Sequence, residues 1–246
     1  MGRPGLPMES AFMNKTGRWL LTALCLLSLA AAGGRPSPRD EPKAPSAGGG
    51  DKAPTRTVKG QVLTSAEMPA VSLKFDKEFK YVGGQTFILY DVARAEQHFF
   101  VDADDKGNVK RMYWVQFEGY LPDNAHSYKY KATKTVEIGG LEFIADSAAR
   151  NVKANSGRPD SDGNRTRTFL EGKGYRMASD EVLWQRLVHL VDKEKRNELM
   201  IVYTEDLAGM KLTAKDLAPK GPAAGKWEGI AKDLLDRAVK GIELER

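Results

Sequence analysis

The sequence predicts an α+β protein in which a curved, mostly antiparallel sheet packs against two C-terminal amphipathic helices. About seven to nine strands, joined as meander hairpins, are expected in the sheet. From residue 57 onward the 246-residue chain is rich in β-branched and aromatic residues. Turn signals recur there about every 8 to 15 residues, which is typical of short strands. The C-terminal third adds apolar residues at helical spacing, and this completes the α+β pattern.

The N-terminus has the pattern of a signal peptide. Lys15 and Arg18 precede the apolar run Trp19–Ala32, which ends in three alanines. This run is shorter than the about 20 residues that a membrane-spanning helix needs. We therefore expect residues 1–32 to be cleaved near Ala32, the mature protein to be secreted or periplasmic, and no stable membrane span to remain.

The mature chain excludes thiol chemistry. Cys25 is the only cysteine, and it lies in the predicted signal peptide. Removal of three basic residues and one acidic residue (Arg3, Lys15, Arg18 and Glu9) changes the formal charge from +5 to +3. Such a mild charge does not favour a nucleic-acid partner.

Residues 33–56 are predicted to be a disordered linker. They hold five prolines and five glycines in 24 residues, without Val, Ile, Leu or an aromatic residue to bury. Residues 57–246 are predicted to form one domain, mainly β over 57–178 and helix–strand–helix over 179–246. The expected strands are Thr57–Thr64, Val71–Phe75, Phe79–Val82, Gln85–Ala93, Gln97–Ala103, Val109–Glu118, Tyr128–Ile138, Leu141–Ala148, Arg165–Leu170 and Leu199–Thr204.

Three glycine-containing turns predict hairpins. A turn at Gly139-Gly140 pairs Ile138 with Leu141 and Val136 with Phe143. A turn at Lys106-Gly107 pairs Phe99 with Trp114 and Val101 with Met112 on one face, and leaves apolar residues on the other face too. A third turn is expected at Gly83-Gly84.

Two helices are expected near the C-terminus. After Ser179 or Asp180, apolar residues recur at helical spacing as far as Val191, and a second stripe runs from about Lys226 to Ile242. Thr213 and Asp216 have the spacing of a capping box, which predicts a short helix before Pro219.

One apolar face of the sheet is left without a predicted cover. It carries the four residues that we expect to contact a ligand, and it requires closure by the chain itself, a partner or a bound molecule. These residues are Phe99, Val101, Met112 and Trp114.

Catalytic and metal signals are weak. The three histidines, His98, His126 and His189, have no ligand spacing, and no cofactor motif is present, so neither a metal nor a cofactor is expected. The weak catalytic candidate is His126 with Asp123. The weak metal candidates are Asp160, Asp162 and Asn164, whereas the acidic loop from Asp102 lacks two ligands of a calcium site and is expected to be a turn.

The sequence thus favours an exported, non-catalytic binding module that holds an apolar or amphipathic small molecule, or an envelope protein, on one sheet face. A small extracytoplasmic enzyme, such as a hydrolase using His126, is one alternative. A structural envelope protein is the other. The alternating Tyr128-Lys129-Tyr130-Lys131 resembles a stacking platform, but we expect an ordinary edge strand there rather than a nucleic-acid site.

Overall fold

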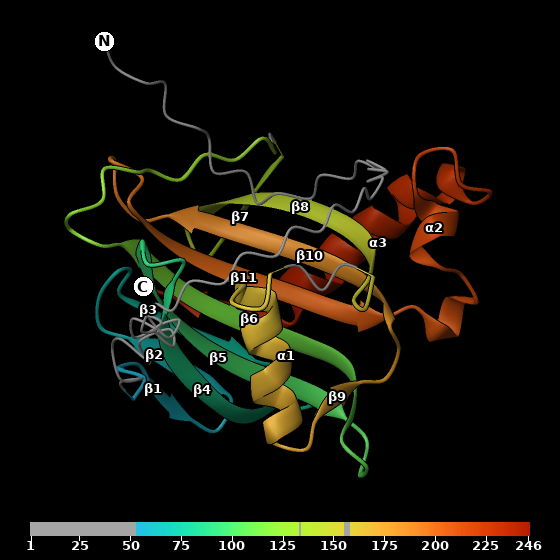
Figure 1. The fold of residues 1–246 in the computed structure, drawn as a ribbon, viewed down its shortest axis with the longest axis horizontal. Coiled ribbons are helices and arrows are strands. Elements are labelled where there is room, and N and C mark those ends of the chain that lie inside the picture. The colour runs from blue at the N-terminus through green and yellow to red at the C-terminus, as the bar shows by residue number, and fades with distance from the viewer. Residues whose placement is uncertain (1–52, 133, 155–157) are drawn as a thin grey trace, which may run out of the picture. The chain divides into compact units, whose positions relative to one another are not determined.

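The strands form two sheets, which share a core. The computed structural model describes residues 53–132, 134–154 and 158–246. In these residues the eight-stranded sheet has the order β4-β5-β6-β11-β10-β8-β7, with β9 paired to β6, and the four-stranded sheet has the order β1-β2-β3-β12. All pairings are antiparallel except that of β9 (Figure 1). The strands are β1 Thr57–Lys59, β2 Val62–Ser65, β3 Val71–Phe75, β4 Lys80–Leu89, β5 Ala93–Ala103, β6 Asn108–Tyr120, β7 Thr135–Ile138, β8 Leu141–Asn151, β9 Arg176–Met177, β10 Glu181–Leu190, β11 Asn197–Asp206 and β12 Ile242–Glu245.

Three α-helices and two 3-10 turns complete the described residues. They are α1 Asp162–Gly172, α2 Ala214–Leu217 and α3 Trp227–Lys240, with η1 at Ala208–Met210 and η2 at Ala224–Lys226. The predicted α+β fold of mostly antiparallel strands is thereby confirmed, although the strands divide between two sheets rather than one. The predicted signal peptide and most of the predicted linker lie outside the described residues.

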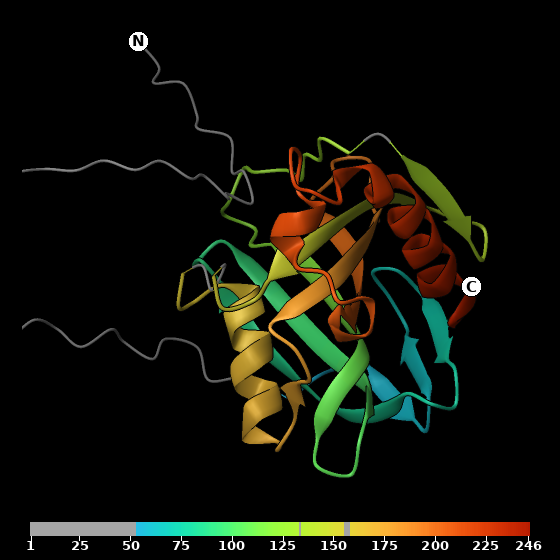
Figure 2. The same ribbon diagram turned by 90° about the vertical axis from the view of Figure 1, so that its right-hand side faces the viewer.

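The two faces of the large sheet have different covers. The first face packs against the small sheet and α3, and the second face packs against α1 (Figure 2). The core of the first face includes Phe100, Tyr113, Leu187 and Ile201 from the large sheet, Leu73 and Phe75 from the small sheet, and Leu234 from α3. Each such side chain contributes about 1.5 to 3 kcal/mol when it is fully buried, so this shared core holds the two sheets together.

Two of the three predicted hairpins are confirmed together with their registers. Ile138 pairs with Leu141 and Val136 with Phe143. In the β5–β6 hairpin Phe99 pairs with Trp114, and Asp104 accepts hydrogen bonds from the backbone N–H groups of the turn. The helix from about Lys226 and the capping box of Thr213 with Asp216 are confirmed as well.

The helix predicted after Ser179 is wrong, because this segment is the interior strand β10. Leu183 and Leu187 face the first core, whereas Trp184 and Val188 face the second. A strand that is apolar on both faces loses its period of two, and here the resulting pairs of apolar residues imitate helical spacing. The C-terminal part of the domain is therefore not helix–strand–helix.

The strand predicted at Arg165–Leu170 is wrong in the opposite sense, because it lies within α1. Ser161 caps this helix by accepting a hydrogen bond from the backbone of Asn164, which satisfies one of the free N–H groups of the first turn. Only Asn164, Thr166 and Leu170 of the helix are buried. The helix thus depends on its cap as well as on a narrow buried stripe.

Three other predicted boundaries also differ. Gly83-Gly84 is no turn, because β4 continues through it with a register shift between Tyr81 and Gly83, and the chain reverses after Leu89 instead. The predicted strand Thr57–Thr64 is divided into β1 and β2 at Gly60, which has a positive φ. The predicted strand Tyr128–Ile138 begins only at Thr135.

Candidate functional site

The four predicted ligand-contact residues lie together on the second face. Phe99 is paired with Trp114 and Val101 with Met112, and all four are buried. They belong to a core cluster with Leu170 of α1, and the rings of Phe99 and Phe169 lie 5.0 Å apart. The structure thus brings these residues together, and α1 covers the β4–β5 side of the face that carries them (Figures 1 and 2).

The β8–β10 side of the second face is only half buried. Its polar side chains are stacked on aromatic rings: the Arg150 guanidinium lies 3.7 Å from the Trp184 ring, and that of Arg186 lies 5.2 Å from Trp184 and 5.0 Å from Tyr130. Arg186 also makes two hydrogen bonds to Asp146, at 2.9 and 2.7 Å. Burial and the nearby Arg186 charge lower the pKa of Arg150 to about 10. This strip combines aromatic surface with charge, a combination that suits an amphipathic molecule.

A row of amides crosses the middle of the second face. Gln85, Gln97 and Gln116 are neighbours on β4, β5 and β6. Each donates a hydrogen bond toward the next: Gln85 to Gln97 at 2.7 Å, Gln97 to Gln116 at 2.7 Å, and Gln116 to Glu118 at 2.5 Å. The Trp114 indole N–H also donates to Gln116, at 3.1 Å. A connected network of this kind satisfies polar groups that burial would otherwise penalise.

The amide row ends at a pair of carboxyl groups. Glu118 on β6 and Glu198 on β11 are direct cross-strand partners on the second face. The Tyr128 hydroxyl donates to Glu118 at 2.8 Å, and the Tyr130 hydroxyl donates to Glu198 at 2.5 Å. Two acidic side chains directly opposite each other in a sheet repel when both are ionised.

Burial dominates the electrostatics of this pair. Burial raises the pKa of Glu118. Burial and the negative charge of Glu118 together raise the pKa of Glu198. Asp162, at the start of α1, also has a pKa raised by burial. The hydrogen bonds from Tyr128 and Tyr130 lower the pKa values of the two glutamates, but by less than burial raises them. The pair therefore retains a proton at pH values where an exposed glutamate is ionised.

The predicted catalytic pair is not assembled. His126 and Asp123 lie in the connection after β6, and among the described residues no hydrogen bond joins their side chains. The His126 backbone N–H donates to Asn124, and its carbonyl accepts from Arg196. Within the described ranges, the hydrogen bonds of His126 are made by its backbone and join it to no general base or acid.

The other two histidines are bonded within the fold. His98 is fully buried on the first face, 2.8 Å from Glu96 and 3.1 Å from the Tyr81 hydroxyl. Although burial opposes ionisation, hydrogen bonds from His98 and from the backbone of Arg56 and Thr55 lower the pKa of Glu96. Because His98 and Glu96 are buried and Glu96 ties down the last residues of the predicted linker, the geometry of this cluster suits a structural role. His189 is on β10 rather than on a helix and bonds the Glu142 carbonyl.

The three metal candidates are not arranged as a site. Asp160 pairs with Arg158, the Asn164 amide donates to the Arg158 carbonyl, and Asp162 accepts from the Gly163 N–H. Within the described ranges no group of three or more metal-ligating side chains could hold an ion.

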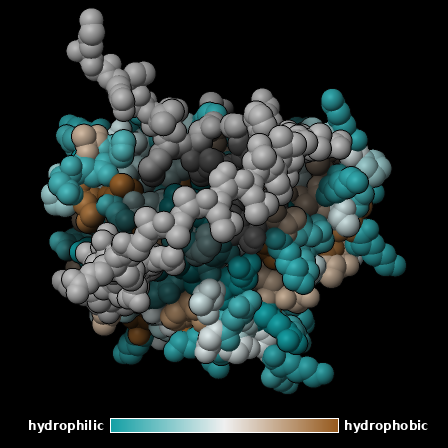
Figure 3. All heavy atoms as spheres, viewed as in Figure 1, coloured by the Kyte–Doolittle hydropathy of each residue, from teal (hydrophilic) through white to brown (hydrophobic). Residues whose placement is uncertain are grey.

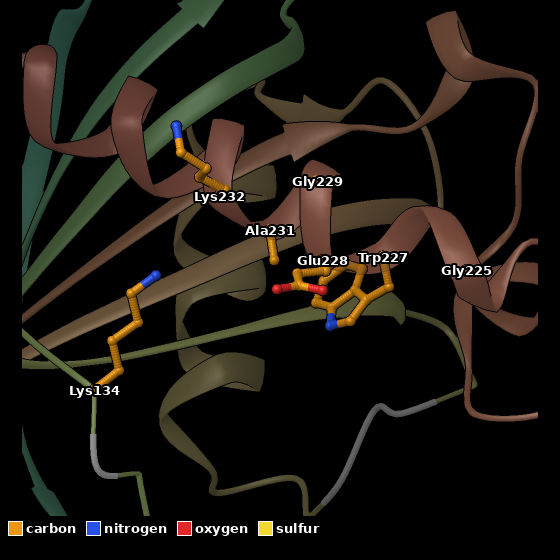
Figure 4. Close-up of a pocket in the computed structure, with 7 residues that line it drawn as sticks. All are labelled: Lys134, Gly225, Trp227, Glu228, Gly229, Ala231 and Lys232. Atoms are coloured by element: carbon orange, nitrogen blue, oxygen red, sulfur yellow. The ribbon is translucent and has the colours of Figure 1, made fainter.

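A surface pocket of about 610 Å³ lies at the start of α3 (Figure 4). Its lining residues are Lys134, Gly225, Trp227, Glu228, Gly229, Ala231 and Lys232. Lys232 is paired with Asp236, and the pocket is open to solvent. It holds none of the residues that the sequence singled out.

The sequence reasoning missed the polar part of the second face, namely Gln97, Gln116, Glu118, Arg186 and Glu198. A signal was available for Gln116 and Glu118, since they continue the alternation of Met112 and Trp114 along β6. Arg186 was missed because the segment that forms β10 was predicted to be an amphipathic helix, and Arg186 would lie on the polar side of that helix.

The fold and this face define a two-sheet α+β protein with a mixed polar and aromatic sheet face. No family model, curated protein or solved structure matches the chain. In the part of the chain that the structure describes, each helix is too short or too polar to cross a membrane.

Proposed function

We propose that the protein is an exported, non-catalytic binding module that holds an amphipathic molecule on the second face of the large sheet. The observation that carries this proposal is the half-buried strip of Trp184, Arg186 and Tyr130 beside the apolar residues Trp114 and Val202. Val202 lies between Trp114 and Arg186 in the strand register. A ligand on this strip would contact apolar and charged groups at once.

The chemistry favours an amphipathic ligand over a purely apolar one. Val188, Met200 and Val202 are buried apolar neighbours of this strip, and the amide of Gln116 and the carboxyl of Glu118 lie on the same face. Binding sites for small molecules commonly combine an apolar lining with a few placed polar groups. An envelope protein inserting an amphipathic segment would use the same contacts, and it is the other occupant that the test can reveal.

The two alternative functions have less support. An enzyme using His126 would need a carboxylate in hydrogen-bond reach, and the described side chains supply none to it. A structural protein would need an apolar surface patch, but the only large apolar side chains exposed in the described residues are Met68 and Met210, each 41% exposed. On the one face seen in Figure 3, the coloured atoms are mostly polar, with smaller apolar areas between them.

Export is proposed on the N-terminal sequence alone. Its support is the signal-peptide pattern, in which Lys15 and Arg18 precede the apolar run Trp19–Ala32. When the full-length gene is expressed in a secreting host, we expect extracytoplasmic protein that begins near Gly33. Protein that keeps residues 1–32 and stays in the cytosolic fraction would refute export.

Binding is tested on protein expressed from the full-length gene. Native mass spectrometry, followed by solvent extraction, detects molecules that copurify, and titration with anilinonaphthalene sulfonate supplies a defined amphipathic probe. We expect Trp184→Ala to weaken probe binding about tenfold, equivalent to about 1.4 kcal/mol. Trp227→Ala is the matched control: it removes a half-buried tryptophan that lines the surface pocket on α3, so it reports probe bound in that pocket and should leave binding on the second face unchanged.

Three results would contradict the proposal: no extra mass together with no probe binding, equal binding by the wild type and Trp184→Ala, or equal losses in both tryptophan variants. A bound protein chain instead of a small molecule would identify an envelope partner as the occupant.

A further inference from the structure

Residues 121–132 form a strap that leaves the end of β6 and leads toward β7. In the sheet order, β11, β10 and β8 lie between these two strands, so the strap must cross their ends. It contains no regular strand. Its backbone is held by the Tyr128 N–H, which donates to Lys195 at 2.7 Å, and by the Arg196 guanidinium, which donates to the carbonyls of Leu121 and His126.

Two tyrosine side chains fasten the strap to the second face. Tyr128 donates to Glu118 and Tyr130 donates to Glu198, and the rings of Tyr128 and Tyr120 stack with centroids 4.6 Å apart. Both side-chain hydrogen bonds therefore end on the cross-strand carboxyl pair. The strap is joined to the sheet at a point where two acidic groups face each other.

We propose that the Glu118–Glu198 pair is a pH-operated latch, which holds the strap on the second face while the pair retains a proton and loosens it when both carboxyls ionise. Opposite residues in an antiparallel pair have Cβ atoms about 4.5 to 5.5 Å apart. Ionisation strengthens each tyrosine hydrogen bond, but two charges on such neighbouring side chains, away from water, repel strongly, and admitting water under the strap relieves the repulsion.

In the described part of the chain, both negative and positive groups lie near the pair. Asp162 of α1 adds a negative charge, and Tyr120, Tyr128 and Tyr130 have raised pKa values and stay neutral. Among the described residues, the cations on this face are Arg186 of β10, which is bonded to Asp146, and Arg150 of β8, which lies over the Trp184 ring. Arg196 donates to carbonyls of the strap and lies 5.9 Å from the Tyr120 ring. Two ionised glutamates would therefore leave excess negative charge under the strap.

Loosening the strap would carry Tyr130 away from Arg186 and expose more of Arg186 and Trp184, so the latch would control access to the binding face. This last consequence rests on the proposed function, whereas the latch itself does not. Hydrogen exchange without any ligand therefore tests the latch, and its failure is distinguishable from a failure of binding.

The test is hydrogen–deuterium exchange on protein expressed from the full-length gene, at about pH 6 and about pH 9, with each amide's protection corrected for its intrinsic exchange rate. Between these values we expect protection of the 121–132 amides to fall at least about tenfold. Amides of β5 should keep their protection. Equal protection of the strap at both pH values would overturn the proposal, and so would a parallel loss in β5, since that would report global unfolding.

A pair of variants separates ionisation from packing. Glu198→Gln keeps an oxygen that can accept from Tyr130 but cannot ionise, so its strap should stay protected at about pH 9. Glu205→Gln is the matched control, because Glu205 lies on the same strand and accepts from Tyr203 on the opposite face. We expect it to show the wild-type loss in the strap. The latch is refuted if Glu198→Gln loses as much strap protection as the wild type.

Discussion

At Gly107 the backbone has a φ of +77°, and a Cβ atom there would clash with the carbonyl oxygen of Gly174. The turn between β5 and β6 thus requires glycine for two separate reasons. We predict that Gly107→Ala lowers the free energy of unfolding by about 2 to 4 kcal/mol. This loss combines backbone strain at residue 107 with displacement of Gly174, which lies between α1 and β9. Urea denaturation measures this.

Gly140 provides the control for the turn prediction. Its φ is +74°, but a Cβ atom there would have no neighbour within 4 Å. Gly140→Ala should therefore lower the free energy of unfolding through backbone strain alone, by about 1 kcal/mol. Equal losses in the two variants would mean that the contact with Gly174 contributes nothing.

Single residues also show where sequence reasoning about the site succeeds and fails. The β5–β6 register placed Phe99 opposite Trp114 on one face, because alternation and a glycine turn are local signals. The pairing of Glu118 with Glu198 joins strands that are about 80 residues apart in the chain, and no local pattern encodes it. The same holds for the tyrosines of the strap, whose partners become visible only when β11 lies beside β6.

Among the elements, β10 shows how tertiary structure overrides local pattern. The residues from 180 to 191 have helical spacing, yet eight of them pair with β8 and nine with β11. The paired strands satisfy the backbone on both sides, and β10 packs against a core cluster on each face. By contrast, α3 was predictable because its apolar stripe faces one core and its other side faces solvent.

An isolated peptide covering residues 180–191 should reveal the local preference. Without β8 and β11, we predict circular dichroism of a helix in trifluoroethanol and of a largely disordered chain in water. A peptide covering β11, residues 197–206, is the control and should form less helix under the same conditions because it is rich in residues that favour strands. Equal helix content in the two peptides would show that the spacing in β10 has no local influence.

At the scale of the whole molecule, the buried carboxyl groups of the second face affect stability. Glu118, Glu198 and Asp162 have raised pKa values in the folded protein, so between pH 4.5 and neutrality the folded state holds protons that the unfolded state has released. The free energy of unfolding then falls as pH rises, by up to about 1.4 kcal/mol per pH unit for each group. Groups with lowered pKa values, such as Glu96, act in the opposite direction only at acid pH.

We therefore predict that the urea midpoint decreases from about pH 5 to about pH 8 and that the double variant Glu118→Gln, Glu198→Gln flattens this decrease. The variant should be more stable than the wild type at about pH 8, since two amides replace two acids that resist ionisation, and its advantage should shrink at about pH 5, where both carboxyls are protonated in the fold. A midpoint that does not change with pH in the wild type, or a variant with the steeper decrease, would show that these carboxyls are well solvated and that the second face is open to water in the free protein.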